Sequence, residues 1–334
     1  MTLKIGVLDQ SPIISGHAPA QALRETIELA RHAEQLGFYR YWLAEHHNMR
    51  GLADPCPEIL LGQIAAATTR IRVGTGGVML PYYSPLKIAE VFRMYEALFP
   101  GRIDLGIGRA PGGDMLTARA MNAEAFDDMS RFPTQVQEVA GWLDGNLAPE
   151  HPYATVTAMP AGRTAPQMWL LGSSDYSGAL AAYLGLRFAY AHFINSRGGE
   201  VVSQAYRQDF RRSDRESAPS SMVCVFALCA KTDAEAEQLA ASIDHRRLLM
   251  ATGREGPIAT VEQAQAYPYS ESDRAIIARE RARAVIGSPE TVKARLLEIR
   301  DAYHADELMI VTITGDYGTR LRSYELLANV FALG

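Results

Sequence analysis

Short runs of apolar residues alternate along the chain with longer stretches in which apolar side chains recur every three or four positions. A short apolar run between turn residues predicts a buried strand, and the longer spacing predicts an amphipathic helix. Eight strands are predicted, at residues 4–8, 39–44, 71–73, 103–108, 167–171, 187–191, 222–230 and 307–313. Strands alternating with helices predict a parallel sheet, and the number eight favours an α/β fold, a closed (β/α)8 TIM barrel, over a doubly wound sheet.

Capping residues, prolines and glycines set the expected element boundaries. Ser84-Pro85 predicts the start of a helix that Pro100-Gly101 ends, and a further helix is predicted at about 125–143. Prolines and glycines interrupt the segments at about 145–166 and 252–274, which we expect to be irregular insertions in the carboxyl-end loops, the second a candidate lid. Barrels of this length are often one domain, so we expect residues 1–334 to form a single domain.

The composition narrows the function classes only slightly. A formal net charge of −5 gives no sign of a nucleic-acid or anionic membrane partner, and no apolar run approaches the length of a spanning helix. The chain enters its first strand almost at once, which does not fit a signal or transit peptide. Its three cysteines, Cys56, Cys224 and Cys229, lack metal-site spacing. A reduced, cytoplasmic protein is the simplest expectation.

Residues suited to binding and catalysis follow the predicted strands at their carboxyl ends. In a parallel barrel these ends meet on one face, which carries the active site. Gly76-Gly77 interrupts a strand pattern, which indicates either a flexible turn or a ligand lying close to the backbone. The other candidates are Asp9, Gln10, Glu45, His46, His47, Gly108, Arg109, Ser173, Ser174, His192 and Asn195. Their shared position predicts a single site.

The pair His46-His47 beside Glu45 has three interpretations. Adjacent strand residues point to opposite faces, so both histidines could reach one metal ion only with distortion, and no metal is expected. An imidazole held by neighbouring backbone and carboxylate groups is the commonest alternative. The third interpretation makes His46 an acid–base or hydrogen-bonding group over a substrate.

The segment Gly172-Ser173-Ser174-Asp175 joins a strand to a helix, where hydroxyl groups and free N–H groups suit a phosphate. Ordinary N-capping would explain the same residues. Arg109 favours the anion site, because a guanidinium at the rim needs an anionic partner. Arg131 is either a second clamp or a solvated charge. The glycines at 106–112 do not fit a dinucleotide fingerprint, and a Walker A sequence is absent.

Several ordered motifs carry a family resemblance. They are RYWLAEHHN (40–48), IRVGTGGVMLPYYSPLKIAE (71–90), FPGRIDLGIGRAPG (99–112), WLLGSSDYSG (169–178), AHFIN (191–195) and AVIGSPETV (284–292). Over nearly its whole length the chain resembles the bacterial luciferase-like flavin-dependent monooxygenases, in particular the luciferase-like or alkanal-monooxygenase-like subgroup. The resemblance implies a TIM barrel that binds reduced FMN, or in some relatives the deazaflavin F420, at the carboxyl face.

The resemblance also implies roles for single residues. His46 matches the catalytic histidine near the reactive carbon of the flavin, and Gly76-Gly77, joined by a cis peptide, would lie against the ring. His192 takes the place of a tryptophan beside the ring. The implied cofactor contacts are Gly108, Arg109, Arg131, Gly172, Ser173 and Ser174. Ser173 stands where the luciferase has a glutamate, and Gly108 where it has a reactive-site cysteine, so we expect no light emission.

The implied reaction is the oxygenation of a small organic substrate by reduced FMN and O2 through a C4a-peroxyflavin. No second nucleotide-binding motif is visible, so a separate flavin reductase is the expected source of reduced flavin, and the family suggests a homodimer. Two alternatives stay open: an F420-dependent hydride-transfer enzyme, and a flavin-binding protein without turnover. A metal hydrolase is a more distant one.

Overall fold

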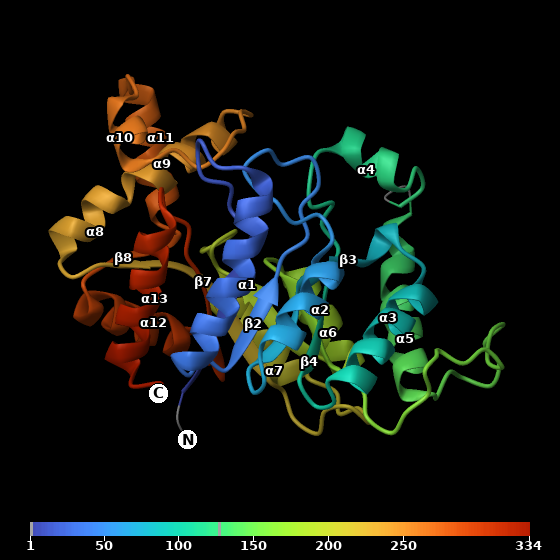
Figure 1. Cartoon of the computed structure of the whole chain (residues 1–334). Coiled ribbons are helices and arrows are strands. Elements are labelled where there is room, and N and C mark those ends of the chain that lie inside the picture. The colour runs from blue at the N-terminus through green and yellow to red at the C-terminus, as the bar shows by residue number, and fades with distance from the viewer. Residues whose placement is uncertain (1–2, 126–127) are drawn as a thin grey trace.

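The computed structural model describes residues 3–125 and 128–334, and eight of its strands close into a barrel (Figure 1). Each strand of the ring pairs in parallel with both neighbours, in the order β1-β2-β3-β4-β5-β6-β7-β9, and β9 returns to β1. The strands are β1 Lys4–Asp9, β2 Arg40–Leu43, β3 Arg72–Met79, β4 Ile103–Gly108, β5 Gln167–Gly172, β6 Arg187–Ala191, β7 Ser221–Cys229 and β9 Glu307–Val311. The predicted (β/α)8 TIM barrel is confirmed.

Helices cover the outside of the barrel and part of its carboxyl end (Figure 1). They are α1 Pro19–Gln35, α2 Pro57–Ala67, α3 Pro85–Leu98, α4 Met115–Met121, α5 Phe132–Asp144, α6 Asp175–Leu184, α7 Gly199–Asp209, α8 Asp233–Leu239, α9 Ala241–Ala251, α10 Val261–Ala266, α11 Glu271–Arg281, α12 Pro289–Ala302 and α13 Tyr317–Phe331. None of the helices in the described part of the chain is both long and apolar enough to cross a membrane.

A ninth strand, β8 (Ala284–Gly287), lies outside the ring and pairs only with the end of β7. Sequence patterning did not predict it as a strand. The run is four residues long and follows a polar helix, so it lacks the length and alternation that identify longer strands. Its pairing with Phe226–Cys229 is a tertiary contact that no local pattern reports.

Two other predicted boundaries differ from the structure. The predicted helix at 125–143 begins at Phe132, after a short 3₁₀ turn, and residues 126–127 lie outside the described residues. Pro133 lacks an N–H and so suits only the first turn. The segment 252–274, predicted to be irregular, contains α10 and the start of α11. Thr260 and Ser270 cap these helices, with Gln263 and Asp273 completing two capping boxes. Residues 145–166 form turns without helix or strand, as predicted, but they join α5 to the start of β5 and so lie at the amino end of the barrel, not in a carboxyl-end loop.

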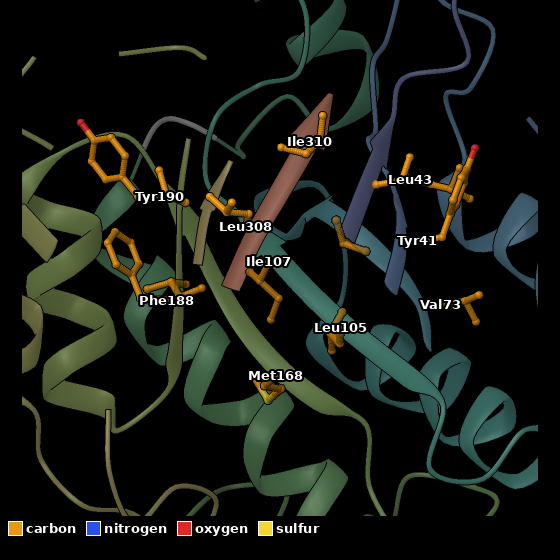
Figure 2. Packing of buried hydrophobic residues seen from close by; sticks show 14 of the residues in the cluster. Tyr41, Leu43, Val73, Leu105, Ile107, Met168, Phe188, Tyr190, Leu308 and Ile310 are labelled. Atoms are coloured by element: carbon orange, nitrogen blue, oxygen red, sulfur yellow. The ribbon is translucent and has the colours of Figure 1, made fainter. Parts of the chain in front are cut away.

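Side chains alternate between the two faces of the barrel wall. Figure 2 shows part of the outward set, which packs against the helices and includes Tyr41, Leu105, Phe188 and Ile310. The inward set fills the barrel: Leu8, Trp42, Trp169, Ala189, Met222, Cys224, Phe226 and Met309. This alternation follows from the pleat of each strand, so the interior is a packed core rather than a pore.

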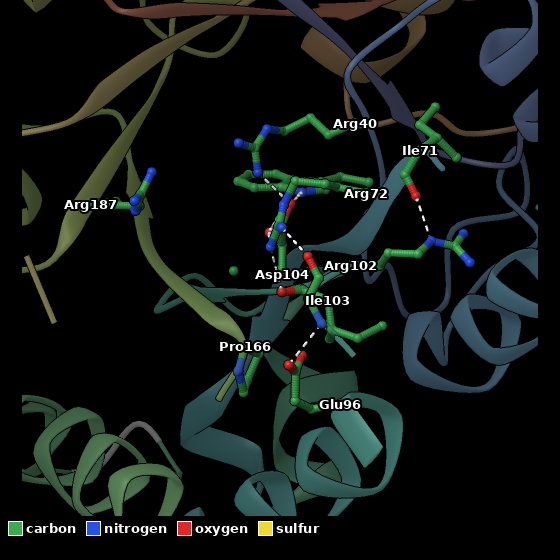
Figure 3. Close-up of polar contacts among 12 residues, drawn as sticks. Arg40, Ile71, Arg72, Glu96, Arg102, Ile103, Asp104, Pro166 and Arg187 are labelled. Atoms are coloured by element: carbon green, nitrogen blue, oxygen red, sulfur yellow. Dashed lines mark hydrogen bonds and ion pairs between the residues drawn. The ribbon is translucent and has the colours of Figure 1, made fainter. Parts of the chain in front are cut away.

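A buried charge cluster closes the amino end of the barrel (Figure 3). The Arg40 guanidinium donates to Glu307 from Nε at 2.8 Å and from Nη2 at 3.0 Å, and it also pairs with Asp104. Arg72 donates to the other oxygen of Asp104, and the indole N–H of Trp42 donates to Asp104 at 2.9 Å. Arg40, Asp104 and Glu307 are 1%, 0% and 3% exposed, so the cluster is a charge-balanced floor beneath the packed interior.

Candidate functional site

A cavity of about 240 Å³ opens above this packed interior, at the carboxyl ends of the strands. Its lining is mostly apolar, with a few polar groups. It brings together seven predicted residues: Gly76, Gly77, Gly108, Arg109, Gly172, Ser173 and Ser174. An apolar cavity with a few polar groups at this face of a barrel is the expected form of a ligand site.

One wall of the cavity is the backbone of Gly76-Gly77, whose peptide bond is cis, as the resemblance implies. The pairing of β3 with β4 shifts register across this pair. A Cβ at Gly77 would lie 2.8 Å from the carbonyl oxygen of Gly106, and one at Gly76 would lie 2.8 Å from Leu8 Cδ1 and 3.1 Å from the Trp42 ring. Both positions therefore require glycine, and the wall has no side chain.

Another side of the cavity is suited to an anion. Arg109 is partly buried, with its guanidinium 4.1 Å from the centre of the Tyr176 ring, and its side chain makes no hydrogen bond or ion pair within residues 3–125 and 128–334. A cation held by an aromatic face but without an anionic partner is available to a ligand.

The loop before α6 lies beside Arg109 in the cavity lining. Ser174 is the N-cap of α6 and shares a capping box with Ser177, while the carbonyl of Ser173 accepts from Asn195 Nδ2 at 3.1 Å and from the Tyr190 hydroxyl at 3.3 Å. These contacts fix the loop. They leave the Ser173 hydroxyl without a hydrogen-bond partner among the described residues, so the loop presents a hydroxyl and a helix N-terminus next to a cation.

His46 follows β2 and is partly buried, but it does not line the cavity. Its backbone N–H donates to the Asp54 carbonyl at 3.3 Å, and its buried Nδ1 has no hydrogen-bond partner in the described part of the chain. Burial, followed by the positive charge of Arg246, lowers the pKa of His46 to about 4. The imidazole is therefore neutral at pH 7 and keeps the capacity to accept or donate a hydrogen bond.

His47 is turned to other partners. Its Nε2 lies 2.8 Å from Glu45 Oε1, and its ring meets the edge of Tyr82. Glu45 is fully buried and also accepts from the Met79 N–H at 2.9 Å and from the Tyr83 hydroxyl at 2.8 Å. Glu45 thus ties the end of β2 to the end of β3, beside the glycine wall. Among residues 3–125 and 128–334 no three His, Cys, Asp or Glu side chains form a metal-binding group.

Two of the predicted cofactor-binding residues, like His46, lie outside the cavity lining. His192 is buried against Tyr303, with ring centres 5.7 Å apart, because it continues the outward set of β6; burial lowers its pKa to about 4. Its neighbours Ala191 and Phe193 line the cavity instead. Arg131 is exposed and lines a separate surface hollow that it shares with Asp128.

Sequence reasoning did not select the apolar part of the lining. These residues are Leu8, Trp42, Met79, Leu171, Ala189, Ala191, Phe193, Ile194 and Cys224. Most of them are inward-facing residues near the carboxyl ends of strands. Every second residue of a strand faces the same side, so the residues two and four positions before an inward-facing residue at a strand end also face the barrel interior. This rule would have identified several of the lining residues.

Comparison with known proteins agrees with this architecture. The family model for luciferase-like monooxygenases matches residues 3–305, and the chain belongs to that family. It is 44% identical to the uncharacterized protein YceB of Bacillus subtilis, over 98% of this chain and 99% of that one. It is 35% identical to the N-acetyl-S-alkylcysteine monooxygenase of the same organism, over 98% of each chain. The crystal structure of apo-MsnO8 is 38% identical and superposes with a TM-score of 0.92, covering 99% of each chain. The protein is therefore an oxidoreductase of a class that incorporates oxygen.

Proposed function

We propose that the protein is a flavin-dependent monooxygenase that uses reduced FMN and O2 to oxygenate a small organic substrate. The observation that carries the proposal is the pairing, in one cavity, of the glycine wall with the anion-suited rim at Arg109 and Ser173. A planar ring fits a wall without Cβ atoms. A phosphate fits a guanidinium, a free hydroxyl and a helix N-terminus. The residues present therefore fit FMN at both ends.

Reduced FMN would supply the electrons and the C4a carbon at which O2 is activated. The protein's own residues would do the rest. Trp42, Leu171 and Phe193 would give the ring a dry, apolar surrounding, and Arg109 and Ser173 would anchor the phosphate. His46 would offer a neutral imidazole from the loop after β2, at the carboxyl face. Such a group can hydrogen-bond the oxygen that is transferred, in a site that excludes water.

The test is anaerobic titration with reduced FMN, and separately with reduced F420, followed by rapid mixing with O2. We expect reduced FMN to bind, and an oxygen-dependent absorbance change to precede the spectrum of oxidised FMN. A substrate panel would include N-acetyl-S-alkylcysteines, in view of the name of the relative from Bacillus subtilis. Isotopically labelled O2 should then place one labelled oxygen atom in the product. Binding of F420 alone, without an oxygen-dependent signal, would contradict the proposal.

F420-dependent hydride transfer is the second candidate. Two solved structures that share the fold at low sequence identity are complexes with different cofactors. One is a type II Baeyer–Villiger monooxygenase in complex with FMN, at 20% identity, and the other is an F420-dependent secondary alcohol dehydrogenase, at 11% identity. We favour FMN because a relative at 35% identity over 98% of this chain is named a monooxygenase, and oxygenation by a flavin enzyme requires a reduced flavin that reacts with O2.

Replacement of Arg109 by alanine should weaken reduced FMN without weakening riboflavin. The guanidinium forms no ion pair among the described residues, so its loss removes a charge-assisted contact to the phosphate, which is worth about 10- to 100-fold in Kd. Parallel titrations of the two flavins measure the effect, with Arg131→Ala as the comparison. Equal losses for FMN and riboflavin would refute a phosphate role for Arg109, and a selective loss in Arg131→Ala would move the phosphate beyond the cavity.

We also propose a separate flavin reductase as the source of reduced FMN, and a homodimer as the assembly. Support for the dimer comes from the surface of α2 and α3, where Ile59, Met94 and Leu98 are 66%, 55% and 65% exposed. The Tyr95 hydroxyl of α3 donates to the Glu58 carbonyl of α2, so the two helices touch next to Ile59 and Met94. Large exposed apolar side chains gathered in one region are typical of an interface. Light scattering would report twice the 36.6 kDa chain mass.

A further inference from the structure

A second unpaired cation lies at the carboxyl end of the barrel, apart from the Arg109 rim. Arg246 is on α9, in the segment that follows β7, whereas Arg109 and Ser173 follow β4 and β5. Figure 1 shows α9 at the upper end of the barrel, close to the loops that leave β1 and β2. Arg246 therefore belongs to a different sector of the mouth from the proposed phosphate site.

The guanidinium of Arg246 reaches the loop after β2. A Cβ at Gly51 would lie 3.1 Å from its Nη1 and 2.4 Å from the carbonyl oxygen of Gly256, so three chain segments meet there with almost no room to spare. Together with Met49 and Glu255 these residues enclose a small cavity. The same loop carries His46, whose pKa is lowered first by burial and then by the charge of Arg246. By its position against Gly51, Arg246 thus touches the loop that carries the proposed catalytic imidazole.

Within residues 3–125 and 128–334, the Arg246 side chain makes no hydrogen bond, ion pair or ring contact. Burial lowers the pKa of its guanidinium to about 10. Its neighbours differ. Arg247 donates to the Glu280 carbonyl and lies over the Phe226 ring, and Arg254 donates to Thr252 and to the Tyr267 hydroxyl. Glu255 is the acidic residue whose charge acts on Arg246, but the two side chains form no ion pair in the described structure. A partly buried cation carries a desolvation cost, which an anionic ligand would offset.

We propose that Arg246 is the anion-binding residue of the substrate site, and that the substrate carries a carboxylate. The inference rests on the proposed monooxygenase function, because it assigns the cation near His46 to the substrate and the cation at Arg109 to the cofactor. A guanidinium fork binds a carboxylate through two parallel hydrogen bonds, so it fixes orientation as well as charge.

The test uses matched acids and amides as probes: hexanoate with hexanamide, and N-acetylmethionine with its amide. Calorimetric titration of the protein loaded with reduced FMN, under anaerobic conditions, gives each Kd. In the wild-type protein we expect at least one acid to bind about tenfold or more tightly than its amide, because a charge-assisted pair is lost in the amide. Arg246→Gln should remove that preference, and Arg246→Lys should restore part of it. Arg254→Gln, at the rim of the same small cavity, should retain it.

Three outcomes would overturn the proposal. The wild-type protein could bind no acid more tightly than its amide, or the preference for the acid could persist in Arg246→Gln. A loss of reduced-FMN affinity in Arg246→Gln would assign Arg246 to the cofactor instead. Repeating the titration without flavin separates this proposal from the proposed function. An acid preference that depends on Arg246, in a protein that binds no reduced flavin, would retain the anion site and reject the monooxygenase.

Discussion

Arg40→Ala is expected to lower the free energy of unfolding by about 3–5 kcal/mol, because it leaves two buried carboxylates without their shared partner. Arg40 is 1% exposed and pairs with both Asp104 and Glu307. After the substitution Glu307 keeps only the distant, exposed Lys4 at 3.8 Å, while Asp104 keeps Arg72. Urea unfolding followed by circular dichroism measures the loss.

Arg295→Ala is the matched control for Arg40→Ala. Its ion pair with Glu298 lies on the surface of α12, where both side chains are more than 60% exposed. Such pairs contribute about 0–0.5 kcal/mol. A loss in Arg40→Ala no larger than in Arg295→Ala would mean that the barrel floor is held by apolar packing alone.

His46→Asn should lower the rate of substrate oxygenation by about 10²- to 10³-fold, the usual contribution of a positioned acid–base group. The affinity for reduced FMN should change little, because His46 does not line the cavity that we assign to the ring. Single-turnover mixing with O2 and substrate separates the two quantities. The unproductive release of hydrogen peroxide should rise as oxygenation falls.

The control for His46→Asn is His32→Asn, on α1, where the imidazole lies 3.3 Å from Glu325 and far from the cavity lining. Its kinetics should match those of the wild-type protein. Because the pKa of His46 is about 4, the imidazole is neutral over the whole neutral range and gains its proton only as the pH falls toward 4. The rate should therefore lack a His46 transition near pH 6.5. Unchanged oxygenation in His46→Asn would remove His46 from the mechanism.

Sequence patterning predicted the barrel because its strands are short buried runs whose helices have clear capping signals. It also predicted the residues whose chemistry is local. Arg109 and Ser173 directly follow β4 and β5, and Gly76-Gly77 lie in the last half of β3; the carboxyl ends of the strands in a parallel barrel all meet on one face. The position of these residues along their strands was therefore enough to predict that they lie in one cavity.

Other features depend on contacts that no local pattern records. His192 turns away from the cavity because the side-chain alternation of β6 continues past its end, toward Tyr303, the C-cap of α12. Arg131 lies in a turn whose path is set by Asp128 and Pro133, and this turn leads it to the surface. Arg246 was not predicted because a helical arginine in a polar stretch looks solvated; that it is partly buried and forms no ion pair among the described residues is visible only in three dimensions.

The sealed amino end of the barrel has a kinetic consequence. Trp42 belongs both to the charge cluster, through its bond to Asp104, and to the cavity, through its ring beside Gly76. Under the proposed function, flavin and substrate would therefore enter and leave by the carboxyl face. A ring against the glycine wall would arrive first and depart last, because the substrate would bind between the ring and the opening. Turnover would then follow a compulsory sequence, with the oxygenated product leaving before the spent flavin can be exchanged.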